Sequence, residues 1–147
     1  MKSIRVAAAV ICSQEVPARV FATARGYGPC MGMWEFPGGK LQGRETSQEA
    51  LKREIWEELE AQIQVGEKIK TVEYDYPEFH VSMDCFWCRL IGDHLVLKEA
   101  MGSMWLSRDQ LWDLDWLPAD RMVLEEIEEG MELLERAENP AVPAKND

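Results

Sequence analysis

The residues best placed to do chemistry are three glutamates, Glu54, Glu57 and Glu58, spaced three and four residues apart. In an α-helix of 3.6 residues per turn, side chains at these spacings share a sector of roughly 100°. Like charges this close cost about 0.2–0.5 kcal/mol per pair on an exposed helix, and more when partly buried. Helix stability therefore does not require the group. Hard divalent cations do require several oxygen ligands, so the spacing predicts a cation site.

The neighbouring residues would complete such a site. Gly38 and Gly39, just upstream, allow a tight loop with a free backbone carbonyl. Arg53 can reach Glu57 one turn along the same helix, or Glu45 across the loop. The alternative interpretation of the glutamates is a solvated helix face, which the upstream glycines and the fixed spacing disfavour.

A helix must hold these glutamates, and the sequence marks its start. Thr46 and Glu49 form a capping box, in which each side chain accepts a hydrogen bond from the backbone of the other residue. We therefore expect a helix over residues 46–59. Its apolar positions recur every four residues and form one stripe: Leu51, Ile55 and Leu59.

The rest of the chain reads as one domain, residues 1–138, with a flexible tail at 139–147 that has two prolines and no apolar pattern. We expect strands at residues 4–12, 19–25, 63–76, 79–90 and 104–106, and a glycine-rich loop at 26–32. A short helix is expected from 107 to about 114, and a final helix from near 120 to about 137. The final helix would bury one face, made of Val123, Ile127, Met131 and Leu134.

Composition narrows the function. The 147 residues, 46% of them hydrophobic, suffice for a sizeable core. A net charge of −11 argues against a surface that binds a nucleic-acid polymer. An acidic pocket can nevertheless hold a polyphosphate if divalent cations lie between the negative charges. The longest apolar run, residues 6–12, is too short to cross a bilayer, and no small-residue cleavage site follows it. We expect a cytoplasmic protein without a membrane partner.

A metal or redox site is an alternative at Cys85 and Cys88, which form a C-x-x-C motif near His80 and His94. However, residues 79–90 have the pattern of a strand, and residues three apart on a strand face opposite sides. The two thiols could not then bind one metal. We expect both to be reduced.

The segment that begins at Gly39 resembles the Nudix box, G-x5-E-x7-R-E-U-x-E-E-x-G-U, in which U is aliphatic. The positions that match in register are Gly39, Glu45, Arg53, Glu54, Ile55, Glu57 and Glu58. Glu60 replaces the final box glycine, and Ala61 occupies the last aliphatic position. That glycine usually ends the helix with positive φ, so the replacement affects the expected end of the helix rather than the chemistry. Residues 34–40 and 117–120 resemble the MutT-like and CTP pyrophosphohydrolase-like branch, which includes the 8-oxo-dGTP diphosphatases.

This resemblance implies an α/β fold, an α/β/α sandwich around a central mixed β-sheet. It also implies a hydrolase that converts a nucleoside triphosphate to a monophosphate and pyrophosphate with two or three Mg²⁺, for which Mn²⁺ can substitute. The implied ligands are Glu54, Glu57, Glu58, the Gly39 carbonyl and, from a loop, Glu99. Either Glu54 or Glu99 would be the base, and Arg53 with Glu45 would hold the loop against the helix.

Three further residues are implied on the substrate side, each with a second interpretation. Arg25 would contact phosphates, or is a surface residue. Phe36 would stack on the base, or fills the core. Asp120 would contact the base, or caps the final helix. An ionised Asp120 only accepts hydrogen bonds and suits amino groups such as cytosine N4, which ranks CTP, dCTP and 5-methyl-dCTP with 8-oxo-dGTP.

The implied role is removal of unwanted nucleotides from the pool, by a monomer or homodimer whose partner is a small nucleotide. Two other functions stay open. A Nudix hydrolase of ADP-ribose or a dinucleoside polyphosphate often has extra domains or insertions, which this chain lacks. A non-catalytic nucleotide-binding module usually loses ligand carboxylates, and here all four box glutamates are present.

Overall fold

Strands and helices follow one another in the computed structural model largely as the sequence predicts, and the structure describes residues 1–138. The predicted flexible tail, residues 139–147, lies outside the described residues. In chain order the elements are β1 (Lys2–Ile11), β2 (Arg19–Ala24), β3 (Trp34–Glu35), β4 (Gly38–Lys40), α1 (Ser47–Leu59), β5 (Gln62–Asp75), β6 (Phe79–Ile91), β7 (Gly102–Ser107), the 3₁₀-helix η1 (Arg108–Asp113), α2 (Pro118–Arg121) and α3 (Leu124–Glu138).

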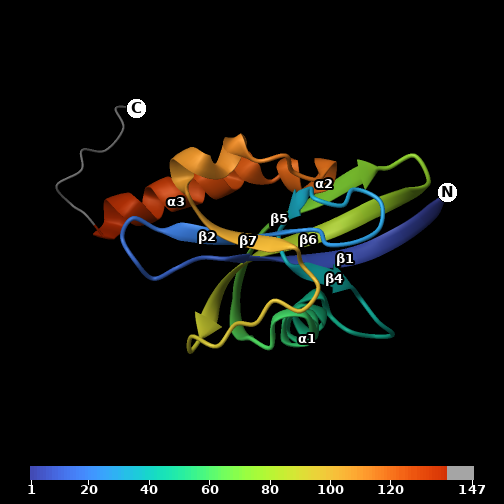
Figure 1. Cartoon of the computed structure of the whole chain (residues 1–147), viewed down its shortest axis with the longest axis horizontal. Coiled ribbons are helices and arrows are strands. Elements are labelled where there is room, and N and C mark those ends of the chain that lie inside the picture. Colours follow the sequence, from blue (N-terminus) through green and yellow to red (C-terminus); the bar gives the residue numbers. More distant parts are fainter. Residues whose placement is uncertain (139–147) are drawn as a thin grey trace.

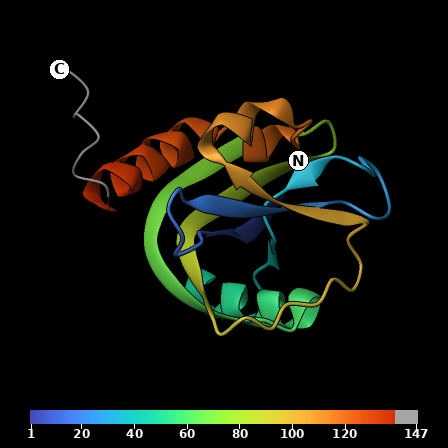
Figure 2. The same ribbon diagram turned by 60° about the vertical axis from the view of Figure 1, so that its left-hand side comes forward.

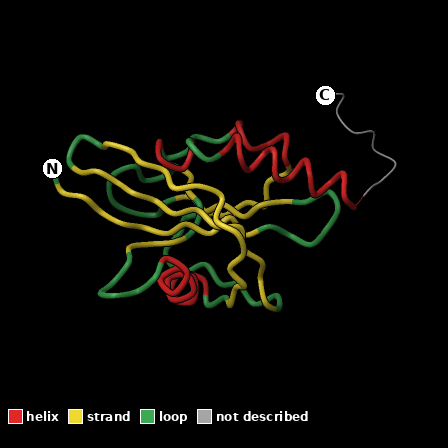
Figure 3. Tube along the Cα trace, turned by 180° about the vertical axis from the view of Figure 1, so that it is seen from behind, coloured by secondary structure: helices red, strands yellow, loops and turns green. Residues whose placement is uncertain are grey.

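The strands form two sheets between two layers of helices. The larger sheet has the order β4-β1-β6-β5; β1 and β6 run parallel and the other pairs antiparallel, so this sheet is mixed. Helix α1 lies on one side of the strands, and α2 and α3 lie on the other (Figure 1). The same layering is visible from behind in Figure 3. The predicted α/β/α sandwich with a mixed sheet is therefore confirmed.

A second sheet, with the order β3-β2-β7, is antiparallel and lies beside the strongly curved larger sheet (Figure 2). The sequence did not predict it. Strand β3 is only two residues long, too short for any alternating pattern to be visible. This sheet brings the ends of β2 and β3 to the region where the candidate site lies.

Strand β1 separates two hydrophobic clusters. Ala8 and Val10 belong to the cluster that packs against α3, whereas Ala9 and Ile11 belong to the cluster that packs against α1. A strand buried on both faces reads as a continuous apolar run, which explains the uninterrupted run in the first strand.

The same alternation determines whether the two thiols of the C-x-x-C motif can meet. Cys85 lies in the cluster on the α3 side and Cys88 in the cluster on the α1 side, so the two thiols face opposite sides of β6, as predicted. Both cysteines are buried and free. Burial raises the pKa of the Cys88 thiol to about 12 and that of Cys85 further still, so both are protonated and unreactive near neutral pH.

The final helix differs from its prediction, because it is two helices rather than one. Pro118 occupies the first turn of α2, where a missing N–H costs nothing, and the helix therefore begins before Asp120. The N–H groups of Met122 and Val123 then donate to carbonyls three residues back, at 3.2 Å, and α3 starts afresh at Leu124. The predicted apolar face is confirmed: Val123, Ile127 and Met131 are fully buried and Leu134 packs against them.

The sequence also predicted the short helix after β7, which is a 3₁₀-helix starting after Ser107. Among residues 1–138, no helix combines the length and apolar composition that spanning a membrane requires.

Candidate active site

Helix α1 is fixed at its start by the predicted capping box. The Glu49 N–H donates to the Thr46 hydroxyl at 3.1 Å, and the Thr46 N–H donates to the Glu49 carboxylate at 2.9 Å. The predicted apolar stripe of Leu51, Ile55 and Leu59 is buried against the larger sheet. With its start capped and one face buried, α1 presents Glu54, Glu57 and Glu58 in a fixed direction.

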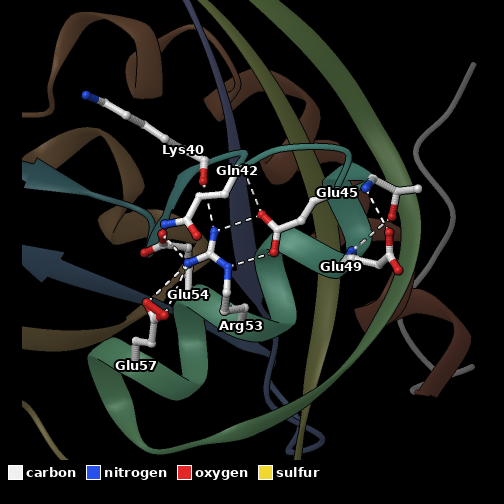
Figure 4. Close-up of polar contacts among 8 residues, drawn as sticks. Lys40, Gln42, Glu45, Glu49, Arg53, Glu54 and Glu57 are labelled. Carbon is white, nitrogen blue, oxygen red and sulfur yellow. Dashed lines mark hydrogen bonds and ion pairs between the residues drawn. The ribbon is translucent and has the colours of Figure 1, made fainter.

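Arg53 organises the polar face of this helix (Figure 4). Its guanidinium donates to both oxygens of Glu45, at 2.7 and 2.9 Å, and to the backbone carbonyl of Lys40 at 3.0 Å. The same group lies 2.8 Å from Glu54 and 3.1 Å from Glu57. The sequence left open whether Arg53 reaches Glu57 or Glu45, and in the structure it contacts both. Arg53 therefore joins the loop before α1 to two of the candidate ligands.

Glu54 lies directly against the backbone of Gly39. A Cβ atom at residue 39 would lie 2.3 Å from the Glu54 carboxyl carbon, so any larger residue would require the Glu54 side chain to move away. The close approach is a physical reason for glycine at this position of the motif. It also brings the Gly39 backbone and the Glu54 carboxylate into one place, as the predicted ligand set requires.

Glu58 is an acid whose surroundings strongly disfavour its charge. Burial, together with the charges of Glu54, Glu35 and Glu99 and against the opposing charge of Arg25, raises the pKa of its carboxyl to about 8. Four acids and one arginine, from α1, β3, a loop and the end of β2, thus lie near one another. Glu57 points more towards solvent, with 53% of its side chain exposed.

Glu35 is a site residue that the sequence did not single out. Its carboxylate accepts two hydrogen bonds from Arg25, at 2.9 and 3.3 Å, which holds the guanidinium beside the acids. The only signal for Glu35 in the sequence was its position in residues 34–40, the segment that leads to Gly39. The pairing itself comes from the contact between β2 and β3, which no local pattern reveals.

Glu99 lies in the loop between β6 and β7, exposed to solvent. Its backbone carbonyl passes so close to Gly26 that a Cβ atom at residue 26 would lie 2.1 Å from the carbonyl oxygen. The loop is thereby held against the end of β2, close enough for the Glu99 charge to raise the pKa of Glu58. The structure thus brings Glu99 towards the α1 glutamates.

Asp120 and Phe36 lie together on the other side of the strands. The Phe36 N–H donates to the Asp120 carboxylate at 2.9 Å. Phe36 is 3% exposed and stacks on Trp116, with ring centroids 4.6 Å apart, which favours the core interpretation of this residue. Asp120 is 5% exposed and lies inside α2, whose N-cap is Leu117, so the interpretation of Asp120 as the helix cap is wrong.

The family is decided by comparison with known proteins. A family model described as NUDIX domain matches residues 7–126. The chain belongs to the Nudix hydrolase family. An 8-oxo-dGTP diphosphatase of Proteus vulgaris is 38% identical over 86 residues, 58% of this chain and 75% of the relative. The CTP pyrophosphohydrolase of Escherichia coli K12 is 29% identical over 126 residues, 85% of this chain and 91% of the relative.

A solved structure agrees with this assignment. The solution NMR structure of the Nudix hydrolase MutT from methicillin-resistant Staphylococcus aureus 252 superposes with a TM-score of 0.69 at 34% identity, covering 88% of this chain and 99% of that one. Nudix hydrolases are typically dependent on divalent metals. The MutT-like and CTP pyrophosphohydrolase-like resemblance seen in the sequence is thereby confirmed.

The Nudix residues present here fit a hard divalent cation by their chemistry. They offer carboxylate oxygens from Glu54, Glu58 and Glu99 and a backbone carbonyl, and the charges of Glu54 and Glu99 add to burial in raising the pKa of Glu58. As the residues stand, no group of three or more His, Cys, Asp or Glu side chains within residues 1–138 is arranged to hold a metal ion. In helix α1, Glu54 and Glu57 are instead paired with Arg53.

Proposed function

We propose that this Nudix hydrolase is a Mg²⁺-dependent nucleoside triphosphate pyrophosphohydrolase, which converts a nucleoside triphosphate and water into a monophosphate and pyrophosphate. The observation that carries the proposal is the crowding of Glu54 and Glu99 around the partly buried carboxyl of Glu58, with Glu54 lying against the backbone of Gly39. Such crowding is unfavourable for an isolated protein and favourable when divalent cations and a polyphosphate share the site.

The ligands we propose are the Gly39 carbonyl, Glu54, Glu57, Glu58 and Glu99. Bound Mg²⁺ would neutralise charge on the phosphates and lower the pKa of a water molecule. Arg53 and Glu45 keep the loop and helix in register, so that Gly39 and Glu54 stay together. Either Glu54 or Glu99 takes the proton from the attacking water.

Arg25 is the residue that we propose for binding the phosphates. Its guanidinium lies beside the acids and is partly exposed, and Glu35 fixes its direction through two hydrogen bonds. A planar cation held in this way is suited to paired contacts with phosphate oxygens. Arg25 pairs with Glu35 and its side chain is 37% exposed, so the interpretation of Arg25 as a surface residue stays the alternative.

The base preference is proposed from Asp120 and from the two kinds of relative. Burial raises the pKa of the Asp120 carboxyl to about 7; the charge of Glu35 raises it and the Phe36 N–H and Arg25 lower it. Above that pH the carboxylate accepts hydrogen bonds, which suits the amino group of cytosine. We propose cytidine-type triphosphates, including 5-methyl-dCTP, and 8-oxo-dGTP as substrates, with a role in cleaning the nucleotide pool.

A substrate panel tests this function. Purified protein with Mg²⁺ is assayed against CTP, dCTP, 5-methyl-dCTP, 8-oxo-dGTP, UTP, ADP-ribose and a dinucleoside polyphosphate. We expect the highest kcat/KM among the first four. A clear preference for ADP-ribose or a dinucleoside polyphosphate would place the chain in another branch of the family. Tight binding of a nucleotide without any hydrolysis would indicate a non-catalytic module.

A further inference from the structure

The loop that carries Glu99 is attached to its surroundings at two backbone points. The Val96 N–H donates to the carbonyl of Leu59, the last residue of α1, at 2.8 Å. The Met101 N–H donates to the carbonyl of Ala24, the last residue of β2, at 3.0 Å. Between these points the backbone carbonyl of Glu99 packs closely against Gly26.

A side-chain contact of this loop involves the residue that departs from the Nudix box. Glu60 is the C-cap of α1 and adopts the left-handed conformation, with φ 49° and ψ 32°, that the box glycine would adopt. A side chain in this conformation is strained, so glutamate here does not serve helix stability. Its carboxylate lies 3.7 Å from the Lys98 ammonium, and Lys98 directly precedes Glu99.

We infer that Glu60 and Lys98 form a positioning pair that holds Glu99 beside the glutamates of α1. The pair ties the end of the helix that carries Glu54 and Glu58 to the stretch of loop that carries Glu99. Glutamate at the position of the box glycine thus helps to position Glu99, at a cost in stability at the C-terminal end of α1. This inference rests on the proposed function, because it concerns how Glu99 is presented to the cations.

The expected effect is modest. Both side chains are partly exposed, 45% for Lys98 and 38% for Glu60, and exposed ion pairs are weak. Losing such a contact should change loop opening and cation affinity by about 2- to 5-fold. Because a structural ion pair would leave cation affinity unchanged, that affinity separates a positioning role from a purely structural one.

The experiment compares Glu60→Gln, Lys98→Gln and the double charge reversal Glu60→Lys with Lys98→Glu. Lys70→Gln is the matched control, because it breaks a shorter ion pair, 2.8 Å to Glu126, away from this loop. Hydrogen exchange of the Val96 and Met101 amides is measured in metal-free protein, and Mn²⁺ affinity is measured by calorimetry without nucleotide. Lys98 is in an exposed loop, so its substitution leaves the fold intact.

We expect both single variants to exchange these amides about 2- to 5-fold faster and to bind Mn²⁺ about 2- to 5-fold more weakly, with the control unchanged and the charge reversal restoring both values. Glu60→Gly should raise Tm, because glycine relieves the strain, and yet weaken Mn²⁺ binding as Glu60→Gln does. Unchanged exchange and affinity in both single variants would overturn the positioning pair.

These outcomes are separate from the proposed function. If wild-type protein hydrolyses no nucleotide, the proposed function fails while the exchange and Mn²⁺ measurements still decide the role of the pair. If wild-type protein is active and Glu60→Gln and Lys98→Gln match it in exchange, affinity and kcat, the positioning pair fails and the function stands.

Discussion

The two sides of the larger sheet assemble their polar residues in different ways. On the α1 side, Arg53 contacts Glu45, Glu54 and Glu57, none more than eight residues away in the sequence. On the α2 side, the Phe36 N–H meets the Asp120 carboxylate across 84 residues. A single segment of sequence therefore contains most of the residues proposed for the reaction, whereas the residues proposed to recognise the base are brought together only by the fold.

This difference predicts two kinds of mutant. A substitution on the α1 side should slow hydrolysis of every substrate by a similar factor. A substitution on the α2 side should change the ranking of substrates.

The largest effect is expected for Glu57→Gln, which removes a proposed ligand charge while leaving Arg53 its contacts with Glu45 and Glu54. Losing such a group costs on the order of 10²-fold in activity. We expect this loss in kcat/KM for CTP and 8-oxo-dGTP alike, measured with Mg²⁺. Glu129→Gln, an exposed acid on α3, is the control. Near-full activity of Glu57→Gln would show that Glu57 is not a ligand.

Asp120→Ala should act on discrimination instead. A base-edge contact is worth about 1–3 kcal/mol, so the ratio of kcat/KM for CTP over UTP should fall by about 10- to 100-fold. Asp120→Asn keeps an acceptor for the Phe36 N–H and therefore separates the structural role of Asp120 from recognition. If Asp120→Ala lowers stability but keeps the wild-type ranking, or if wild-type protein prefers UTP, the base preference arises elsewhere.

The same ratio should depend on pH. Because the pKa of Asp120 is about 7, the ionised fraction rises between pH 6 and 8, and the carboxylate then gains its full capacity to accept hydrogen bonds. We expect the CTP-to-UTP ratio to increase over this range by up to about 10-fold, the change in ionised fraction for such a pKa. Taking a ratio cancels the titration of groups that act on both substrates. Asp120→Asn should abolish the dependence, and a pH dependence that persists in this variant would assign it to another group.

The smallest effect is expected for the two buried cysteines of β6. Cys85→Ala and Cys88→Ala should leave kcat/KM unchanged, since the thiols lie on opposite faces of the strand, each within a hydrophobic cluster. Purified protein should contain no stoichiometric zinc by elemental analysis. One zinc per chain that is lost in either variant would contradict the placement of the thiols.

Local sequence predicts the parts of the molecule whose contacts are local. The capping box, the stripe of α1 and the contact of Arg53 with Glu57 follow from local spacing, because a helix repeats every 3.6 residues. The strands β5 and β6 could be predicted for the same reason, since each is long enough to show its pattern.

The parts that the sequence missed depend on contacts between distant segments. The pairing of Arg25 with Glu35 requires the short strand β3 to lie beside β2, and the burial of Asp120 requires α2 to pack onto the segment that carries Phe36. Glu60 is a third case. Because it replaces the box glycine, the sequence did not predict how the helix ends, and only the backbone shows that glutamate adopts the left-handed conformation there.

The most direct test of the central claim identifies the products of wild-type protein with a cytidine or 8-oxoguanine triphosphate. We predict that, with Mg²⁺, phosphorus NMR will detect monophosphate and pyrophosphate in equal amounts, and that chelation of the metal will stop the reaction. Formation of diphosphate and inorganic phosphate, or undiminished hydrolysis after chelation, would contradict the claim that the crowded glutamates form the site of a metal-dependent pyrophosphohydrolase.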